Sequence, residues 1–180
     1  MPKLSILIAT IPFRELQLQE LIENLHSQGG DVEILVDGNM GYNVGRKRNL
    51  LLERATGEYI VFVDDDDEVS EDYIPLILGA IKSKPDCVGT SGIITINGDT
   101  GHQWHISRRF KKWYEKDGVY FRTPNHISPV RRDIALKAKF KEIAFGEDFD
   151  YSMRILHLLK TEVVIKENIY TYNYVEKSHC

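Results

Sequence analysis

Four consecutive aspartates, residues 64–67, follow directly after the apolar residues 60–63. The β-branched and aromatic side chains of that apolar run predict a buried strand, so the acids stand at its carboxyl end. Ligands of open α/β sheets bind at this end of the strands, and carboxylate oxygens suit Mg²⁺ or Mn²⁺. Two interpretations remain open: a cation site, or a solvated acidic turn before a helix N-terminus, which also favours acids.

A second acidic motif, Gly146-Glu147-Asp148-Phe149-Asp150, stands where a helix is predicted over residues 149–159. A carboxylate at this place can cap the helix, and it can also accept a proton as a general base. The residues alone favour capping.

The elements that position these acids follow from the hydrophobic pattern. Strands are predicted at residues 4–9, 32–36 and 58–63, and they alternate with helices at 14–28, 46–55 and from 70 or 72 to about 84. This alternation is typical of an α/β domain with a mainly parallel central sheet flanked by helices. Beyond it we expect a strand at 87–96, an aromatic and basic region at 101–125, helices at 134–138 and 149–159, and strands at 163–165 and 169–174.

The bulk composition favours one globular domain over residues 1–180, with 42% hydrophobic residues. No apolar stretch approaches the roughly 20 residues of a membrane span, and the N-terminus lacks a signal-peptide pattern. The two cysteines, Cys87 and Cys180, are too few for a disulfide framework. We therefore expect a cytoplasmic protein, whether of a cell or of a virus-infected host.

The net charge of −4 is unevenly distributed. Residues 108–141 contain eleven Lys and Arg against three Asp and Glu, which gives +8, so the remaining residues carry −12. A basic segment beside an acidic site suggests an anionic partner surface. Ordinary solvated charge on loops and a helix explains the same pattern.

Four segments occur in an informative order: SILIATIPFR, EILVDGN, KRNLLLERATGEYIVFVDDDDEV and, much later, GEDFDYSMRI. Together they resemble the family 2 glycosyltransferases, which have the nucleotide-sugar-binding GT-A fold, and the resemblance covers roughly residues 4–156. It implies a metal-dependent, inverting transfer of a sugar from a nucleotide sugar, with a UDP-sugar favoured. The acceptor would be a glycan, a lipid-linked saccharide or a hydroxylated base in viral DNA. The chain is short, so the acceptor-binding part must be minimal.

The resemblance also implies roles for individual residues. Residues 1–86 would form the nucleotide-binding half and residues 87–180 the sugar- and acceptor-binding half. Asp64 and Asp66 of the Asp-x-Asp motif would hold Mn²⁺ or Mg²⁺, with His179 as a further ligand, and Asp65 and Asp67 are the alternatives in register. Asp148 would be the catalytic base, with Glu147 as its neighbour. Nucleotide binding would involve Thr10, Ile11, Pro12, Arg14, Asp37, Arg48, Asn49, Asp64 and Asp65.

The sugar and acceptor would meet Asn125, His126 and Trp104. Four of the assigned residues have a structural alternative: a turn for Asp37, pairing with the acid run for Arg48, a structural histidine for His126 and core packing for Trp104. At the level of the whole chain, a nucleotide-sugar-binding module without transfer activity stays open. A nucleotidyltransferase would need a glycine-rich phosphate loop after the first strand, and residues 10–14 do not offer one.

Overall fold

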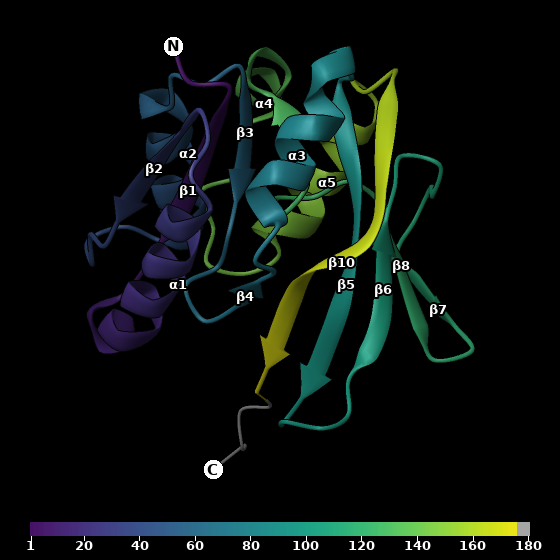
Figure 1. Ribbon diagram of the computed structural model, residues 1–180, viewed down its shortest axis with the longest axis horizontal. Helices are drawn as coiled ribbons and strands as arrows, with labels where there is room; N and C mark the ends of the chain where they lie inside the picture. Colours follow the sequence, from purple (N-terminus) through teal and green to yellow (C-terminus); the bar gives the residue numbers. More distant parts are fainter. Residues whose placement is uncertain (176–180) are drawn as a thin grey trace.

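A computed structural model describes residues 1–175 of the chain (Figure 1). Its first half is built on three parallel strands: β1 (Leu4–Ala9), β2 (Val32–Asp37) and β3 (Tyr59–Phe62). β1 lies between the other two and pairs with both. Because the strands run in the same direction, their carboxyl ends meet at one edge of the sheet. The backbone N–H of Thr10 donates to the Asp37 carbonyl across that edge at 2.9 Å.

Side chains of these strands alternate between two hydrophobic cores, as the period of a strand requires. Ile6 and Val61 belong to one core, whereas Leu7, Ile60 and Phe62 belong to the other. The first core is covered by α1 (Glu15–Gln28), which follows the 3₁₀ turn η1 (Pro12–Arg14), and by α3 (Tyr73–Ala80), which continues into η2 (Ile81–Ser83). The second core is covered by α2 (Val44–Arg54), α4 (Arg132–Ala138) and α5 (Glu147–Leu156). The sheet is therefore flanked by helices on both faces, as predicted.

The second half of the chain extends the same sheet with strands of both directions. These strands are β4 (Glu68–Val69), β5 (Cys87–Ile96), β6 (His102–Ile106), β7 (Tyr114–Lys116), β8 (Val119–Arg122), β9 (Val130–Arg131) and β10 (Glu162–Tyr174). The order is β2-β1-β3-β9-β5-β6-β8-β7, and β10 pairs with β5 and β4. The parallel arrangement predicted from the first three strand–helix repeats holds for β1–β3. The other half is mixed, because short connections such as that between β5 and β6 join only antiparallel strands.

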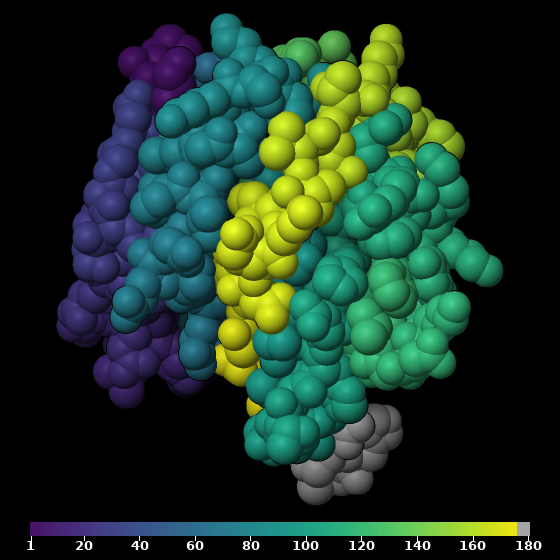
Figure 2. Space-filling view, turned by 45° about the vertical axis from the view of Figure 1, so that its right-hand side comes forward, coloured from purple at the N-terminus to yellow at the C-terminus, as the bar shows by residue number. Residues whose placement is uncertain are grey.

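The two final strands expected from the sequence are one strand, β10. Its pairing with β5 shifts in register between Val164 and Asn168 and again between Asn168 and Tyr170. The irregular stretch includes the polar residues 166–168, which lie between the two predicted strands. Figure 2 shows β10 in yellow, running across one face of the molecule with α3 on one side and β5 and β6 on the other. Within residues 1–175, no helix is long and apolar enough to cross a membrane.

Candidate active site

Two adjoining cavities open near the carboxyl ends of β1 and β3. The wider cavity has a volume of about 740 Å³, and the narrower one about 270 Å³. Arg48, Asp64, Phe145 and Tyr172 line both of them. The acid run and the second acidic motif therefore meet in one continuous depression, although they are far apart in the sequence.

The acid run divides its side chains between the cavity wall and the protein interior. Asp65 is only 2% exposed, accepting hydrogen bonds from Thr10 Oγ1 at 2.7 Å and Arg14 Nη1 at 2.6 Å. Arg14 also reaches Asp66 with its other terminal nitrogen at 2.8 Å. Asp66 keeps about a third of its side chain exposed and lines the wider cavity. Burial raises the pKa of Asp66, and Asp64 and Asp65 add to this effect while Arg14 opposes it.

Asp67, the last acid of the run, connects it to β10. Its carboxylate accepts a hydrogen bond from the Tyr170 hydroxyl at 2.7 Å and another from the Asn173 backbone N–H at 2.9 Å. Burial and the charge of Asp64 raise the pKa of Asp67 to about 8. Through these two hydrogen bonds Asp67 anchors the turn after β3 to β10.

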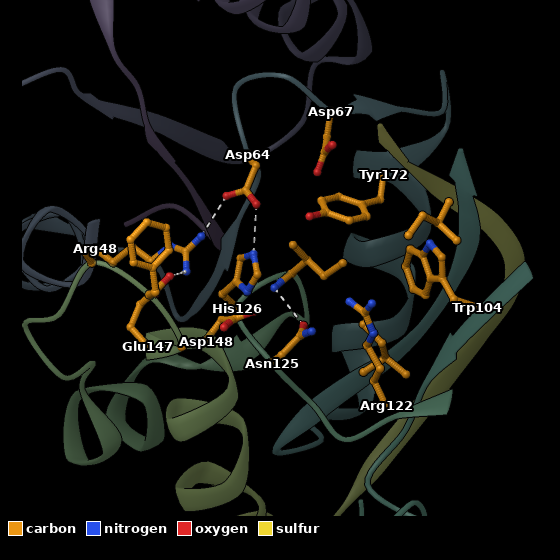
Figure 3. Close-up of a pocket in the computed structure, with 16 residues that line it drawn as sticks. Arg48, Asp64, Asp67, Trp104, Arg122, Asn125, His126, Glu147, Asp148 and Tyr172 are labelled. Atoms are coloured by element: carbon orange, nitrogen blue, oxygen red, sulfur yellow. Dashed lines mark hydrogen bonds and ion pairs between the residues drawn. The ribbon is translucent and has the colours of Figure 1, made fainter. Parts of the chain in front are cut away.

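Arg48 links the two acidic motifs. Its guanidinium donates to Asp64 Oδ1 at 2.9 Å and to Glu147 Oε1 at 2.7 Å (Figure 3). His126 Nε2 lies 3.1 Å from the other oxygen of Asp64. Burial alone would raise the pKa of Asp64, but His126 and Arg48 outweigh it and hold the pKa well below the usual range. Asp64 is thus a fixed negative charge between the cavities. Burial raises the pKa of Glu147, against the attraction of Arg48.

Asp148 lies in the first turn of α5 and lines the narrower cavity beside Glu147. It does not cap the helix: the residue at the cap is Gly146, whose φ of 79° places it in the left-handed region, and no side chain caps there. The Asp148 carboxylate accepts the backbone N–H of Phe149 at 2.7 Å. Asp150, the other capping candidate, pairs with Lys141 and Arg154. The structure thus leaves Asp148 facing the cavity.

Cations gather at the wider cavity. Lys47 and Arg48 are buried on the inner side of α2, and Arg14 follows β1. Lys47 Nζ donates to the carbonyl of Thr10 at 2.7 Å, which fixes it at the end of β1. A cavity with cations beside carboxylates can hold an anionic group such as a diphosphate, with or without a bridging cation.

Comparison with known proteins identifies the family. The sequence model described as Glycosyl transferase family 2 matches residues 15–143. The chain belongs to glycosyl transferase family 2. No curated protein matches this family 2 member in sequence.

Solved structures share the fold of this family 2 member at low identity. The crystal structure of S. aureus TarS 1–349 has a TM-score of 0.70 at 16% identity over 95% of this chain. The same fragment in complex with UDP-GlcNAc has a TM-score of 0.69 at 16% identity over 98% of this chain. In complex with UDP it has a TM-score of 0.69 at 18% identity over 96% of this chain. The match covers 60% of each TarS chain. The likeness shows the predicted GT-A fold, and this chain is shorter than the TarS fragment.

The structure brings most of the predicted site residues of this family 2 member together. Thr10, Ile11, Arg14, Asp65 and Asp66 line the wider cavity. Trp104, Asn125, His126, Glu147 and Asp148 line the narrower one, and Arg48 and Asp64 line both.

Three predicted residues do not line either cavity, and a fourth cannot be placed. Asp37 accepts the backbone N–H of Asn39 at 2.9 Å, as in the turn considered for it. Asn49 is buried and exchanges two hydrogen bonds with the backbone of Phe140, so its amide is used for packing. Pro12 stands exposed in η1. His179 lies outside the described residues.

Lys47, Arg122 and Tyr172 also line the cavities, although they were not among the predicted site residues of this family 2 member. Lys47 carried a usable signal: it shares the buried side of α2 with Arg48 and Leu51, at helical spacing. Arg122 and Tyr172 gave no such signal, because their strands reach the cavity only through pairing with β5 and β6.

Proposed function

We propose that this chain transfers a sugar from a nucleotide-diphosphate sugar, with UDP as the favoured nucleotide, to an acceptor hydroxyl with inversion at the anomeric carbon. The observation that carries the proposal is the junction of the two cavities at Asp64 and Arg48. One cavity has the cations and carboxylates that suit a nucleoside diphosphate, and the other has a carboxylate that can act as a base. The reported complexes of TarS with UDP-GlcNAc and UDP support the choice of nucleotide.

In this proposal the wider cavity holds the nucleotide. Arg14 and Lys47 lie close to the space for the diphosphate, and Thr10 and Ile11 border the space for the nucleoside. Residues 1–86 supply most of this wall, with Phe145 and the end of β10 completing it. Residues 87–175 supply most of the narrower cavity, which would receive the sugar and the acceptor hydroxyl.

The residues at the junction fit a divalent cation. Asp64 and Asp66 offer hard carboxylate oxygens at the wider cavity. Residues 1–175 contain no group of three or more metal-ligating side chains, but Mg²⁺ is commonly held by one or two carboxylates together with substrate phosphates. The carboxylates there outnumber the arginine side chains that pair with them: Arg14 and Arg48 serve Asp64, Asp65, Asp66 and Glu147. A bound metal ion would offset the excess negative charge. When bound, it would neutralise charge that develops on the leaving diphosphate.

Asp148 is our candidate for the base. It accepts the proton of the acceptor hydroxyl as that oxygen attacks the anomeric carbon, and the diphosphate leaves on the opposite side. Glu147 is less suited to act as the base, because its carboxylate accepts a hydrogen bond from the Arg48 guanidinium at 2.7 Å. His126 and Arg48 fix Asp64 at the diphosphate side of the sugar.

The decisive experiment is a thermal-shift panel of UDP, GDP, CMP and dTDP, each with Mn²⁺ and with EDTA. A ligand that binds only the folded state stabilises it by mass action, by about 2.7 kcal/mol when the ligand concentration is 100 times its Kd, and this raises the melting temperature. We expect UDP to stabilise the chain only with Mn²⁺. Asp66→Asn should lose this response, and Glu68→Gln, at an exposed acid just after the aspartate run, should keep it. Absence of any nucleotide response would reject the proposal.

The acceptor class is open to a separate test. Residues 108–141 are basic in sum, but Arg131 pairs with Asp133 and Lys139 with Glu53. A glycan or lipid-linked saccharide is our favoured acceptor, and we place the reaction in the cytoplasm. A DNA acceptor would require affinity that falls steeply with salt concentration, which a filter-binding titration between 50 and 200 mM salt would reveal.

A further inference from the structure

Arg122, the last residue of β8, lines the narrower cavity on the side opposite Arg48 and Glu147 (Figure 3). Its guanidinium carbon lies 4.8 Å from the centre of the Trp113 ring, a stacking arrangement that suits a guanidinium. Trp113 is itself fixed, because its indole N–H lies 2.9 Å from Thr123 Oγ1 and 3.2 Å from Ser152 Oγ. The guanidinium is therefore held on a rigid platform at the cavity wall.

The charge of Arg122 is not neutralised by the described part of the chain. Among residues 1–175, no carboxylate lies within ion-pair distance of its guanidinium, and Asp148 attracts it only across the cavity. Burial accordingly lowers the pKa of Arg122. The other arginines of the two cavities differ, since Arg14 and Arg48 each contact two carboxylates. A partly buried and unpaired cation is costly unless a ligand pairs with it.

Two hydrogen-bond donors near Arg122 lack an acceptor among the described residues. Trp104 Nε1 and Asn125 Nδ2 are buried and have no acceptor among the described residues. Both residues line the narrower cavity with Arg122. Buried polar groups are nearly always hydrogen-bonded in folded proteins. Because both of these nitrogen atoms are buried, the guanidinium of Arg122 is the group that a ligand at this end of the cavity would meet, and its complement is an anion.

We propose that the substrate group entering the narrower cavity carries a carboxylate or a phosphate, and that Arg122 binds this anion. The inference rests on the proposed function and adds the substrate class to it. A guanidinium presents two parallel N–H groups that match either anion. The volume of about 270 Å³ lies just below the usual range of ligand pockets, about 300 to 1,000 Å³, and suits a single sugar unit.

The anion has two possible sources with the same chemistry. It belongs either to the transferred sugar, as in a UDP-linked uronic acid, or to an acidic acceptor. Two calorimetric titrations with Mn²⁺ distinguish them. The first compares UDP-glucuronate with UDP-glucose. The second, in saturating UDP, compares glucuronate and glucose 1-phosphate with glucose.

The variants are Arg122→Met, which keeps an apolar stem over Trp113, and Arg122→Lys, which keeps a charge without the planar fork. Arg109→Met is the matched control: Arg109 lies over the Phe110 ring at 5.3 Å in the same basic segment, but it is exposed and does not line the cavity. Circular dichroism and thermal unfolding establish that each variant folds.

We expect wild type to prefer the acidic ligand in one of the two titrations. Arg122→Met should lower the affinity for that ligand by about 10- to 100-fold, the range for a hydrogen bond to a charged group. It should leave the affinity for the neutral ligand unchanged. Arg122→Lys should recover part of the loss, and Arg109→Met should bind like wild type. Selective loss for UDP-glucuronate assigns the anion to the donor, and selective loss in the second titration assigns it to the acceptor.

Two results would overturn the inference while the proposed function stands. One is UDP binding by a wild-type protein that shows no preference for an acidic ligand in either titration. The other is an equal loss of neutral and acidic ligands in Arg122→Met, which would make Arg122 a packing residue. Absence of UDP binding in wild type would instead reject the proposed function and the inference with it.

Discussion

Replacement of Arg48 by Met should destabilise the folded chain by about 3 kcal/mol. Arg48 is 4% exposed and contacts Asp64 at 2.9 Å and Glu147 at 2.7 Å. Methionine keeps much of the volume but leaves Glu147 buried without a side-chain partner among the described residues. Removal of one partner from a buried ion pair costs about 3 to 5 kcal/mol. We expect the lower end because Asp64 keeps His126 at 3.1 Å.

Urea unfolding and thermal unfolding measure this difference. For a chain of this size, about 3 kcal/mol corresponds to a melting temperature lower by roughly 6 to 12 °C. Arg46→Met is the control on the same helix, because Arg46 is exposed and its nearest acid, Glu142, lies 3.9 Å away. That variant should change stability by less than about 0.5 kcal/mol.

A double-mutant cycle with Glu147→Gln tests the cause. If the unpaired carboxylate produces the loss, the double variant should be more stable than the sum of the single effects predicts, by at least about 1 kcal/mol. Strict additivity, or a loss in Arg48→Met as small as in the Arg46 control, would refute the reasoning.

Three further predictions concern other parts of the molecule. Asp148→Asn should lower kcat by about 10²- to 10⁴-fold in a transfer assay without weakening UDP binding, while Asp150→Asn keeps its turnover; full activity in Asp148→Asn would remove Asp148 from the mechanism. Burial acts to raise the pKa of Asp86, but the backbone N–H groups of Lys160 and Thr161, together with the charge of Arg131, outweigh it and lower that pKa. The stabilisation by ionised Asp86 is therefore present above about pH 3.9 and lost as the pH falls through the folded-state pKa. Asp86→Asn should lower the free energy of unfolding in urea by about 1 to 3 kcal/mol at pH 7 and by progressively less at acid pH. A difference that does not change with pH would contradict this. Gly92→Ala should destabilise by about 1 to 3 kcal/mol, because the new Cβ would collide with the Trp104 ring and the backbone of β10; a melting temperature equal to that of wild type would disprove this close packing.

The parallel half of the fold could be predicted because its information is local. Residues 4–9 and 58–63 are short apolar runs bounded by turn residues, and the structure places strands there. The predicted strand at 87–96 has the same bounds as β5. Residues 101–125 resisted prediction, because their strands are fixed by long-range pairing. Trp104, for example, lies opposite Gly92, a relation that no periodic pattern in the region contains.

The order of the motifs predicted which residues would meet at the site. It did not predict which partner each side chain would contact. Asp65 and Asp66 are neighbours of the same type, yet Asp65 is buried against Thr10 whereas Asp66 keeps about a third of its side chain exposed. Asn49 is similar: its amide bonds the backbone of Phe140, 91 residues away. Local sequence cannot specify such partners, because they depend on the final packing.

The two-residue strand β9 determines how this chain can be divided. It pairs with β3 through Tyr59 and Ile60 and with β5 through Cys87, so a segment from late in the sequence is inserted beside the first three strands. A fragment ending at residue 86 would leave that side of β3 unpaired, and an exposed strand edge promotes association between molecules. Truncation or split-protein designs should therefore keep residues 130–131 with the N-terminal strands, for example by circular permutation rather than by a cut between the halves.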